Sequence, residues 1–218
     1  MLYITQPTYF PWIGFFSFIM NCKKVVFLDD VQFVRSKWQQ RNKIYNKNTF
    51  QYLTVPVIKK GLHNQNLNEV ELKDNFFFKE HLKKIKHAYS KAAYFEEIYH
   101  ELENLENKIL NTNKLCTINL IIIKKILDLL KIDTKFILSS ELDISGKKSE
   151  RIKNICMTMN YKNLFNNEGS KEYMENDIEI FNKNEIKLHF FKYESVKYNQ
   201  LSKNFMNNLS ILDLLFNE

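Results

Sequence analysis

The chain has 218 residues, of which 44% are hydrophobic, and its 32 Lys and Arg outnumber its 25 Asp and Glu to give a formal net charge of +7. This length suits one domain with a sizeable core, and the apolar content excludes general disorder. Three Cys without paired spacing exclude a disulfide framework and a cysteine-based zinc site.

The positive charge is strongly skewed towards Lys. Of the 32 basic residues, 29 are Lys, and the three Arg are Arg35, Arg41 and Arg151. The Lys are spread along the whole chain, and specific recognition of phosphates and bases favours Arg. We therefore interpret the charge as a solvated Lys-rich surface and not as evidence of a nucleic-acid partner. The few Arg, Gly and Pro are expected at positions where guanidinium or backbone geometry requires them.

No segment has the features of a membrane span or a secretory signal. The N-terminus lacks a basic region that leads into an apolar run. The apolar stretch at 118–130 is interrupted by Lys124, Lys125 and Asp128. We therefore expect a soluble, cytoplasmic protein without a membrane span.

The predicted elements alternate between strands and helices at both ends of the chain. Strands are expected, from β-branched and aromatic runs, at 2–5, 25–28, 51–57, 135–138, 162–165 and 187–191. Helices are expected, from apolar residues three and four apart, at 14–20, 76–89, 94–110, 117–130, 149–159, 170–182 and 210–216. This order predicts an α/β fold with an open, mostly parallel sheet flanked by helices. We expect a single domain over 1–218, with a helical insertion at about 75–132.

The first candidate site is the stretch QPTYFPWIG, residues 6–14, which follows the first strand and opens a helix. Ligands bind outside the carboxyl ends of strands in open α/β sheets, and backbone amides at a helix N-terminus suit anionic groups. Tyr9 and Trp12 offer rings for stacking, and Gly14 allows a close backbone approach. A hydrophobic plug built from the same aromatic residues is the alternative.

The second candidate is the pair Asp29 and Asp30, which follows the second predicted strand. Carboxylates at this position suit a hydrated metal ion, sugar or ribose hydroxyls, or general-base chemistry. Strand alternation predicts that the two side chains point to opposite faces, so that only one enters a given site and Asp30 shares its face with Gln32. A simple strand-end turn is the alternative.

The third candidate is the basic stretch that contains Arg35, Arg41 and Asn42. A guanidinium group binds phosphate or carboxylate through two parallel hydrogen bonds. The stretch therefore suits a clamp for the phosphate of a nucleotide or an activated sugar. An ion pair with Asp29 or Asp30 is the alternative.

Two later loops also follow predicted strands. Ser139 comes directly after the strand at 135–138, and Arg151 lies at the start of the next helix, which suits a second anion contact. The loop at 166–173 carries Gly169 and Tyr173 and is placed to close over a ligand. Ordinary loops and helix caps are the alternative for both.

The histidines and cysteines indicate no metal site. None of the five His has metal-ligand spacing, and His63, close to Gly61, is the one candidate for an acid or base. Cys22, Cys116 and Cys156 lie in apolar surroundings and are expected to be buried structural thiols. The sequence identifies no cofactor.

Three N-terminal segments, QPTYFPWIGFFSFI, VVFLDDVQFVRSKWQQRNKI and YLTVPV, closely resemble the WbqC-like family of bacterial proteins. The later pieces SSEL, KSERI, EGSKEY and LSILDLLFN are similar as well, so the resemblance covers essentially the whole chain. The loop NNEGS departs from the richer small-residue pattern of similar proteins and argues against a backbone cradle there. The matched motif positions are Gln6, Pro7, Tyr9, Pro11, Gly14, Asp30, Gln32, Arg41, Asn42, Pro56, Ser139, Arg151, Gly169 and Tyr173.

Members of this family are associated with gene clusters for bacterial surface polysaccharides, O-antigen lipopolysaccharide among them. The resemblance implies a transferase or ligase that acylates, for example glycylates, an amino group on a nucleotide-activated amino sugar. The partners would be that sugar and a small acyl or amino-acid donor. Arg41 would hold phosphate, and Asp30 or His63 would deprotonate the attacking amine. The alternatives are a noncatalytic nucleotide-sugar-binding or assembly partner in the same pathway, and an acyl transferase that draws on a charged tRNA.

Overall fold

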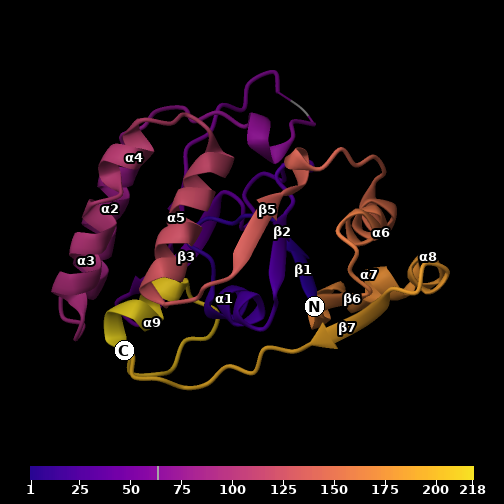
Figure 1. Ribbon diagram of the computed structural model, residues 1–218. Coiled ribbons are helices and arrows are strands. Elements are labelled where there is room, and N and C mark those ends of the chain that lie inside the picture. The colour runs from indigo at the N-terminus through magenta and orange to yellow at the C-terminus, as the bar shows by residue number, and fades with distance from the viewer. Residues whose placement is uncertain (63) are drawn as a thin grey trace. The chain divides into compact units, whose positions relative to one another are not determined.

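The computed structural model describes residues 1–62 and 64–218, apart from the side chain of Tyr173 (Figure 1). The chain divides into two compact units, and each is described by itself. Unit 1 comprises Met1–Gln6, Gly14–Asp30 and Lys131–Glu194. Unit 2 comprises Pro7–Ile13, Val31–Leu130 and Ser195–Glu218. The helices expected at about 75–132 belong to unit 2.

Unit 1 is built on a parallel sheet, which in the described residues has five strands in the order β5-β2-β1-β6-β7. The strands are β1 (Leu2–Thr5), β2 (Lys24–Phe27), β5 (Lys135–Leu138), β6 (Asn163–Asn167) and β7 (Lys187–Phe191). The chain adds β2 and β5 on one side of β1, then crosses to add β6 and β7 on the other. The strand order therefore reverses between β1 and β6, and ligands bind at the carboxyl ends of strands at such a reversal.

Two helices of unit 1 lie within one residue of their expected bounds at 14–20 and 149–159, and a third expected helix is divided in two. The unit 1 helices are α1 (Ile13–Met20), which begins at the last residue of a unit 2 segment, and α6 (Lys148–Thr158), α7 (Lys171–Glu175) and α8 (Ile178–Asn182). The single helix expected at 170–182 is wrong, because the chain breaks at Asn176 and Asp177 between α7 and α8. Short polar side chains of this type compete with the helical backbone for hydrogen bonds.

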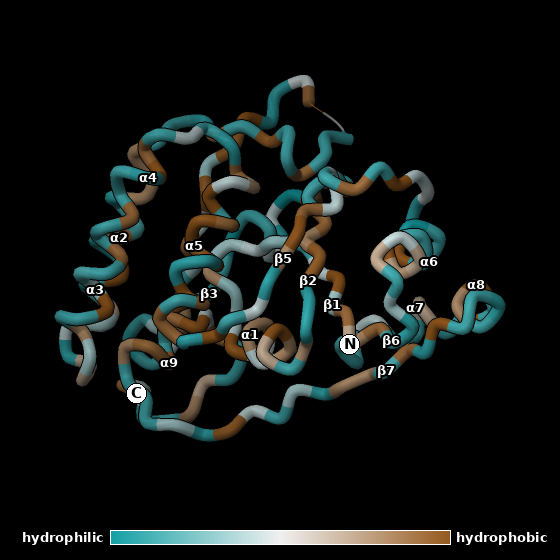
Figure 2. The backbone as a smooth tube through the Cα atoms, viewed as in Figure 1, coloured by the Kyte–Doolittle hydropathy of each residue, from teal (hydrophilic) through white to brown (hydrophobic). Residues whose placement is uncertain are grey.

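One face of the sheet is aliphatic and packs against α6, α7 and α8. Strand side chains alternate between the two faces, so Leu2, Val26 and Leu164 reach the same buried cluster as Ile155 of α6 and Phe181 of α8. The strands β1 and β2 carry brown, hydrophobic segments in Figure 2. The burial of this cluster fixes which face of the sheet these helices cover.

The opposite face of the sheet is aromatic and packs against α1. The ring centroids of Tyr3 and Phe18 lie 5.9 Å apart, and those of Phe15 and Phe27 lie 6.2 Å apart. Phe165 of β6 contacts both Tyr3 and Phe18, with centroid distances of 5.7 and 5.4 Å. With helices on both faces of a parallel sheet, the predicted α/β class is confirmed.

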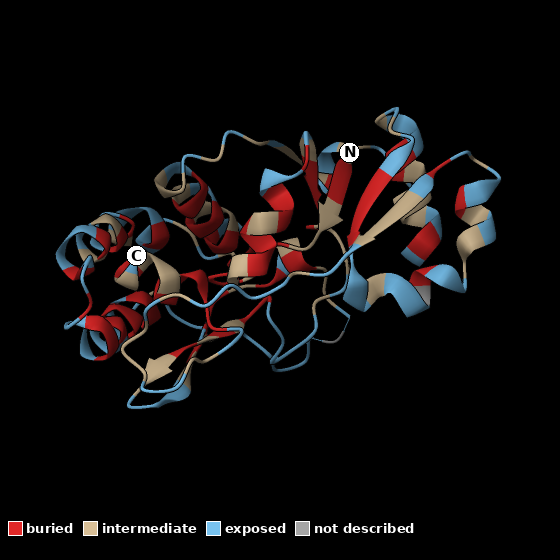
Figure 3. Ribbon diagram, turned by 90° about the horizontal axis from the view of Figure 1, so that it is seen from below, coloured by how far each residue is buried: buried red, intermediate tan, exposed pale blue. Residues whose placement is uncertain are grey.

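Unit 2 combines a β-hairpin with a set of helices. Its helices are α2 (Phe77–Tyr89), α3 (Phe95–Glu103), α4 (Glu106–Leu110), α5 (Leu115–Leu129) and α9 (Ile211–Asn217). The single helix expected at 94–110 is wrong, because it breaks at Asn104 and Leu105 into α3 and α4. Most of the apolar residues of α5 are buried. Figure 3 colours buried residues red along the whole chain. No helix in the described residues is long and apolar enough to cross a membrane.

The hairpin consists of β3 (Arg41–Asn46) and β4 (Thr49–Thr54), which pair in antiparallel fashion. The two residues at its tip, Lys47 and Asn48, have φ of 46° and 64°. Positive φ at both central positions is typical of the type I′ turn that joins two-residue hairpins. No strand was expected at 41–46, because RNKIYN has no β-branched run and the turn that follows it contains no Gly.

Helix α2 buries a histidine in unit 2. His81 is 3% exposed, and its Nδ1 lies 2.8 Å from the hydroxyl oxygen of Tyr9. The pKa of His81 is lowered to about 3, chiefly by burial and also by the positive charge of Lys84, and a hydrogen bond with the backbone of Thr54 opposes this shift only weakly. The imidazole ring is therefore neutral at neutral pH. Its hydrogen bonds with Tyr9 and with the Thr54 backbone join α2 to the loop at 6–14 and to β4.

We expect the free energy of unfolding to fall as the pH drops below 6.5. The unfolded chain binds a proton on His81 near pH 6.5, whereas the folded protein excludes it down to about pH 3, so stability is lost as the pH falls through this window. At pH 5 the loss due to this residue is about 2 kcal/mol. Urea denaturation between pH 5 and pH 8 measures it.

The variant His81→Gln keeps an acceptor for Tyr9 and removes the titrating group. Its free energy of unfolding should therefore fall by about 2 kcal/mol less than that of the wild type when the pH is lowered to 5. His87→Gln is the matched control, since His87 lies exposed on the same helix. Equal pH dependence of stability in the wild type and His81→Gln would contradict the assignment.

Candidate functional site

A polar cluster lies at the carboxyl ends of β2 and β5, which are neighbours in the sheet of unit 1. These strands pair in register, with Phe27 opposite Leu138 at their ends. Asp29 and Asp30 follow β2, and Ser139 begins the turn after β5. The residues that follow these two neighbouring strands therefore lie side by side.

Asp29 is the buried member of the cluster and is 2% exposed. The Ser140 backbone amide donates to its Oδ1 over 3.0 Å, and the Ser140 hydroxyl donates to its Oδ2 over 2.6 Å. The Ser139 hydroxyl lies 3.2 Å from the same Oδ1. A buried carboxylate is stable only when hydrogen bonds replace its hydration. These bonds therefore fix the turn after β5 to the end of β2.

Asp30 is the more accessible carboxylate, with a side chain that is 22% exposed. One of its oxygens contacts the hydroxyl of Ser139, and the other accepts from the guanidinium of Arg151. A carboxylate has about four acceptor positions, and these two partners occupy only part of them. Asp30 is thus oriented by the protein and retains acceptor positions for a ligand.

The structure corrects two expectations about these carboxylates. Asp29 and Asp30 do not point to separate sites, because both reach Ser139. Strand alternation does not apply to them, since β2 ends at Phe27. The ion pair of Asp30 is formed by Arg151 of α6, where the sequence analysis considered Arg35 or Arg41.

Arg151 is itself held from two directions. Its second terminal nitrogen donates to the carbonyl of Ile144 over 2.6 Å, and its side chain is 13% exposed. Gly146 makes room for this arrangement, since it has a φ of 98° and a Cβ there would lie 3.2 Å from the Arg151 amide. The Nε of Arg151 is buried and has no hydrogen-bond partner among the described residues.

Helix α6 carries a further polar contact in unit 1. The Ser149 hydroxyl donates to Oδ2 of Asp177 over 2.6 Å, which joins α6 to the residue before α8. Ser149 is 1% exposed. The start of α6, from which Arg151 reaches Asp30, is therefore fixed against the neighbouring helix.

We expect Arg151→Met to lower the free energy of unfolding by about 2 kcal/mol, because it leaves the partly buried Asp30 carboxylate without its cation. Arg151→Lys should restore only part of the loss, since one ammonium group cannot reproduce the two separate donor directions of the guanidinium. Chemical denaturation of the three proteins measures the difference.

Lys183→Met provides the comparison for this change. It removes the cation of an ion pair with Glu179 whose side chains are 76% and 83% exposed, and such pairs contribute little. Wild-type stability in Arg151→Met would show that the ion pair does not hold the cluster together.

The other predicted site residues of unit 1 lie near the same edge or in its helices. Gln6 follows β1 directly, and Gly169 lies in a short 3-10 turn after β6. These two positions flank the reversal in strand order. Gly14 is buried in α1, and Tyr173 belongs to α7.

The predicted site residues of unit 2 lie in different environments. Tyr9 is fully buried against His81, and Asn42 is buried, with its amide donating to the Phe10 carbonyl over 2.8 Å. The exposed Gln32 amide donates to Asn64 over 3.0 Å. The Arg41 guanidinium lies over the ring of Tyr52. His63 lies outside the described residues. The ligand-binding roles of these residues stay predictions.

The thiols and the acidic groups offer no nucleophile or metal cluster in the part of the chain that the structure describes. Cys22, Cys116 and Cys156 are buried, as predicted. Burial raises the pKa of Cys22 to about 11 and that of Cys156 to about 12, so both remain protonated. Among the described residues, no group of three His, Cys, Asp or Glu is arranged to hold a metal ion.

Comparison with known proteins places the chain in a family. The profile of the WbqC-like protein family matches residues 6–218, so the chain belongs to this family. The uncharacterized protein Rv1507c of Mycobacterium tuberculosis is 31% identical to it over 215 residues, which cover 98% of this chain and 92% of the relative. No solved structure matches the chain.

Proposed function

We propose that this protein is a transferase or ligase of bacterial surface-polysaccharide biosynthesis that acylates, for example glycylates, an amino group on a nucleotide-activated amino sugar. The observation that carries the proposal is the accessible carboxylate of Asp30 at the carboxyl edge of a parallel sheet, oriented by Arg151 and Ser139. Membership of the WbqC-like family supports the pathway, since its members are associated with gene clusters for such polysaccharides.

The position of Asp30 suits recognition of a nucleotide-activated sugar. In parallel sheets with this strand order, an acidic residue after the second strand accepts hydrogen bonds from ribose or sugar hydroxyls. Asp30 occupies the analogous position here, but the loop after β1 lacks the glycine-rich fingerprint of dinucleotide-binding proteins. We therefore place a sugar, and not a dinucleotide, against Asp30.

The same carboxylate suits the chemistry of the amine. An amino sugar carries an ammonium group at neutral pH, which must lose a proton before its nitrogen attacks an acyl carbon. Asp30 accepts that proton, and the nitrogen attacks the acyl carbon, so that the new amide bond forms as the bond between the acyl carbon and its leaving group breaks. The second proton lost by the nitrogen passes to the leaving group, and Asp30 returns the first to solvent. Arg151 and Ser139 hold Asp30 in one orientation, which positions the amine for attack.

A noncatalytic role is the second candidate, since the hydrogen bonds that orient the accessible Asp30 carboxylate also suit binding alone. A protein that binds the nucleotide sugar for a partner enzyme would use the same Asp30 site without turnover.

We expect nucleotide-activated sugars with a free amino group to raise the melting temperature, since a ligand that binds only the folded state stabilises it by about 2.7 kcal/mol at 100 times its dissociation constant. N-acetylated versions of the same sugars should bind more weakly, because they lack the ammonium group. Thermal-shift titration followed by calorimetry measures both.

Asp30→Asn should weaken the aminated ligand about tenfold or more, because it removes the charge from the hydrogen bond. Asp143→Asn is the matched control, as Asp143 is an exposed carboxylate in the loop that precedes α6. If Asp30→Asn and the wild type bind the aminated sugar with equal affinity, the proposed site is wrong. Mass spectrometry of the sugar after incubation with glycine and ATP, or with glycyl-tRNA, then separates the transferase from the binding protein.

A further inference from the structure

The net positive charge of the chain arises in one segment of unit 2. Residues 31–68 contain seven Lys and Arg and no Asp or Glu. The basic residues of this acid-free segment are Arg35, Lys37, Arg41, Lys43, Lys47, Lys59 and Lys60. The rest of the chain is balanced, so this segment accounts for the whole formal charge of +7. The Lys residues are spread along the whole chain, but outside this segment they are balanced by Asp and Glu.

The hairpin within this segment has one buried and one accessible face. Asn42, Ile44 and Leu53 are buried on the inner face. Arg41 and Lys43 alternate with them and therefore lie on the other face. The register places Tyr52 opposite Lys43, and Phe50 opposite Tyr45, on this same outer face.

The outer face carries exposed aromatic rings with cations directly over them. The Arg41 guanidinium lies 4.2 Å from the ring centroid of Tyr52. The Lys43 ammonium lies 4.5 Å from the centroid of Phe50 and 5.8 Å from that of Trp38. Trp38 is 49% exposed and Phe50 is 42% exposed. We call these five residues the aromatic-cationic face.

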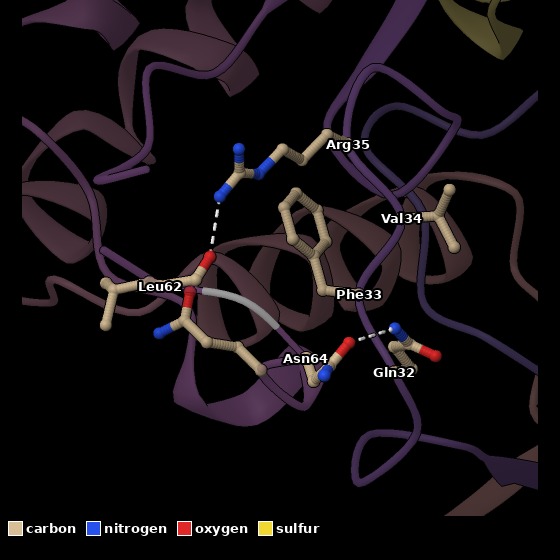
Figure 4. A pocket seen from close by; sticks show the side chains of 7 residues that line it. Gln32, Phe33, Val34, Arg35, Leu62 and Asn64 are labelled. Atoms are coloured by element: carbon tan, nitrogen blue, oxygen red, sulfur yellow. Dashed lines mark hydrogen bonds between the residues drawn. The ribbon is translucent and has the colours of Figure 1, made fainter. Parts of the chain in front are cut away.

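The acid-free segment also forms a pocket of about 450 Å³. Figure 4 shows the ring of Phe33 with Arg35 on one side and the hydrogen-bonded amides of Gln32 and Asn64 on the other. One terminal nitrogen of Arg35 donates to the carbonyls of Lys59 and Leu62, over 2.8 and 2.6 Å. Since a guanidinium has five N–H donors, Arg35 retains donors for an anion. Pockets that hold small ligands measure roughly 300–1,000 Å³.

We propose that the acid-free segment of unit 2 binds single-stranded nucleic acid. Unpaired bases stack on exposed aromatic side chains, and the backbone phosphates are attracted to the cations beside them. The aromatic-cationic face offers both, and the absence of carboxylates removes repulsion of a polyanion. The pocket accepts one unstacked base or nucleotide, with the Phe33 ring for its face and the Gln32 and Asn64 amides for its edge.

The single-stranded form is favoured over the other polyanions by the exposed rings. In a duplex the base faces are covered by stacking, so Trp38 and Phe50 would have no partner. An acidic protein or polyphosphate would use Arg41 and Lys43 without needing the rings. This inference goes beyond the proposed sugar chemistry and does not depend on Asp30.

Fluorescence anisotropy with labelled single-stranded RNA and DNA of about 12 nucleotides tests the proposal. We expect the logarithm of the association constant to fall linearly with the logarithm of the salt concentration, with a slope of about −0.7 for each phosphate contacted. Trp38→Ala and Phe50→Ala should each weaken binding about tenfold. Arg41→Gln with Lys43→Gln should reduce the salt slope by about 1.4.

Phe76→Ala with Lys79→Gln is the matched control, because it removes an exposed aromatic just before α2 and a cation within α2, both outside the acid-free segment. It should leave binding unchanged, as should Asp30→Asn, which separates this proposal from the sugar site. Circular dichroism of each variant checks that it is folded.

Three results would overturn the proposal. The first is that neither single strand binds at micromolar concentration. The second is that duplex or heparin binds as tightly as the single strands. The third is that folded Trp38→Ala and Phe50→Ala bind with unchanged affinity. A preference for RNA over DNA would support it and identify contacts with the 2′-hydroxyl.

Discussion

The burial of the Asp29 carboxylate is the constraint on which the candidate site depends. At 2% exposure this group needs hydrogen bonds in place of water, and Ser139 and Ser140 provide them from the turn after β5. Because that turn is fixed, the Ser139 hydroxyl also reaches Asp30. Arg151 completes the arrangement from α6. A buried acid thus positions an accessible one.

The local parts of the fold could be predicted from the sequence, whereas the long-range parts could not. The strands at 2–5, 135–138 and 187–191 were predicted with their observed bounds, because their runs of β-branched and aromatic residues are short and clearly bounded. Ser210, at the start of the helix expected at 210–216, caps α9, since its hydroxyl accepts from the Leu212 amide. The strand expected at 51–57 overlaps β4 but ends earlier, at Thr54, whereas its partner β3 escaped prediction because buried contacts of the inner face stabilise it and RNKIYN carries no clear strand pattern.

The residues of the candidate site were each predicted from the sequence, but the contacts between them were not. The sequence can indicate that a residue lies near a strand end, as it does for Asp30, Ser139 and Arg151. It cannot indicate which cation pairs with Asp30, because that depends on the order of the strands in the sheet. The charge shows the same limit, as a total of +7 conceals its origin in 31–68. A nucleic-acid-binding surface on unit 2 would agree with the alternative in which the acyl group comes from a charged tRNA.

A crystal structure of the protein with a nucleotide-activated amino sugar bound tests the central claim most directly. Our account predicts that the sugar lies at the carboxyl edge of the unit 1 sheet, with its amino nitrogen within hydrogen-bonding distance of an Asp30 oxygen and with the contact between Asp30 and Arg151 retained. A sugar bound elsewhere, with only solvent at the open side of Asp30, would contradict it.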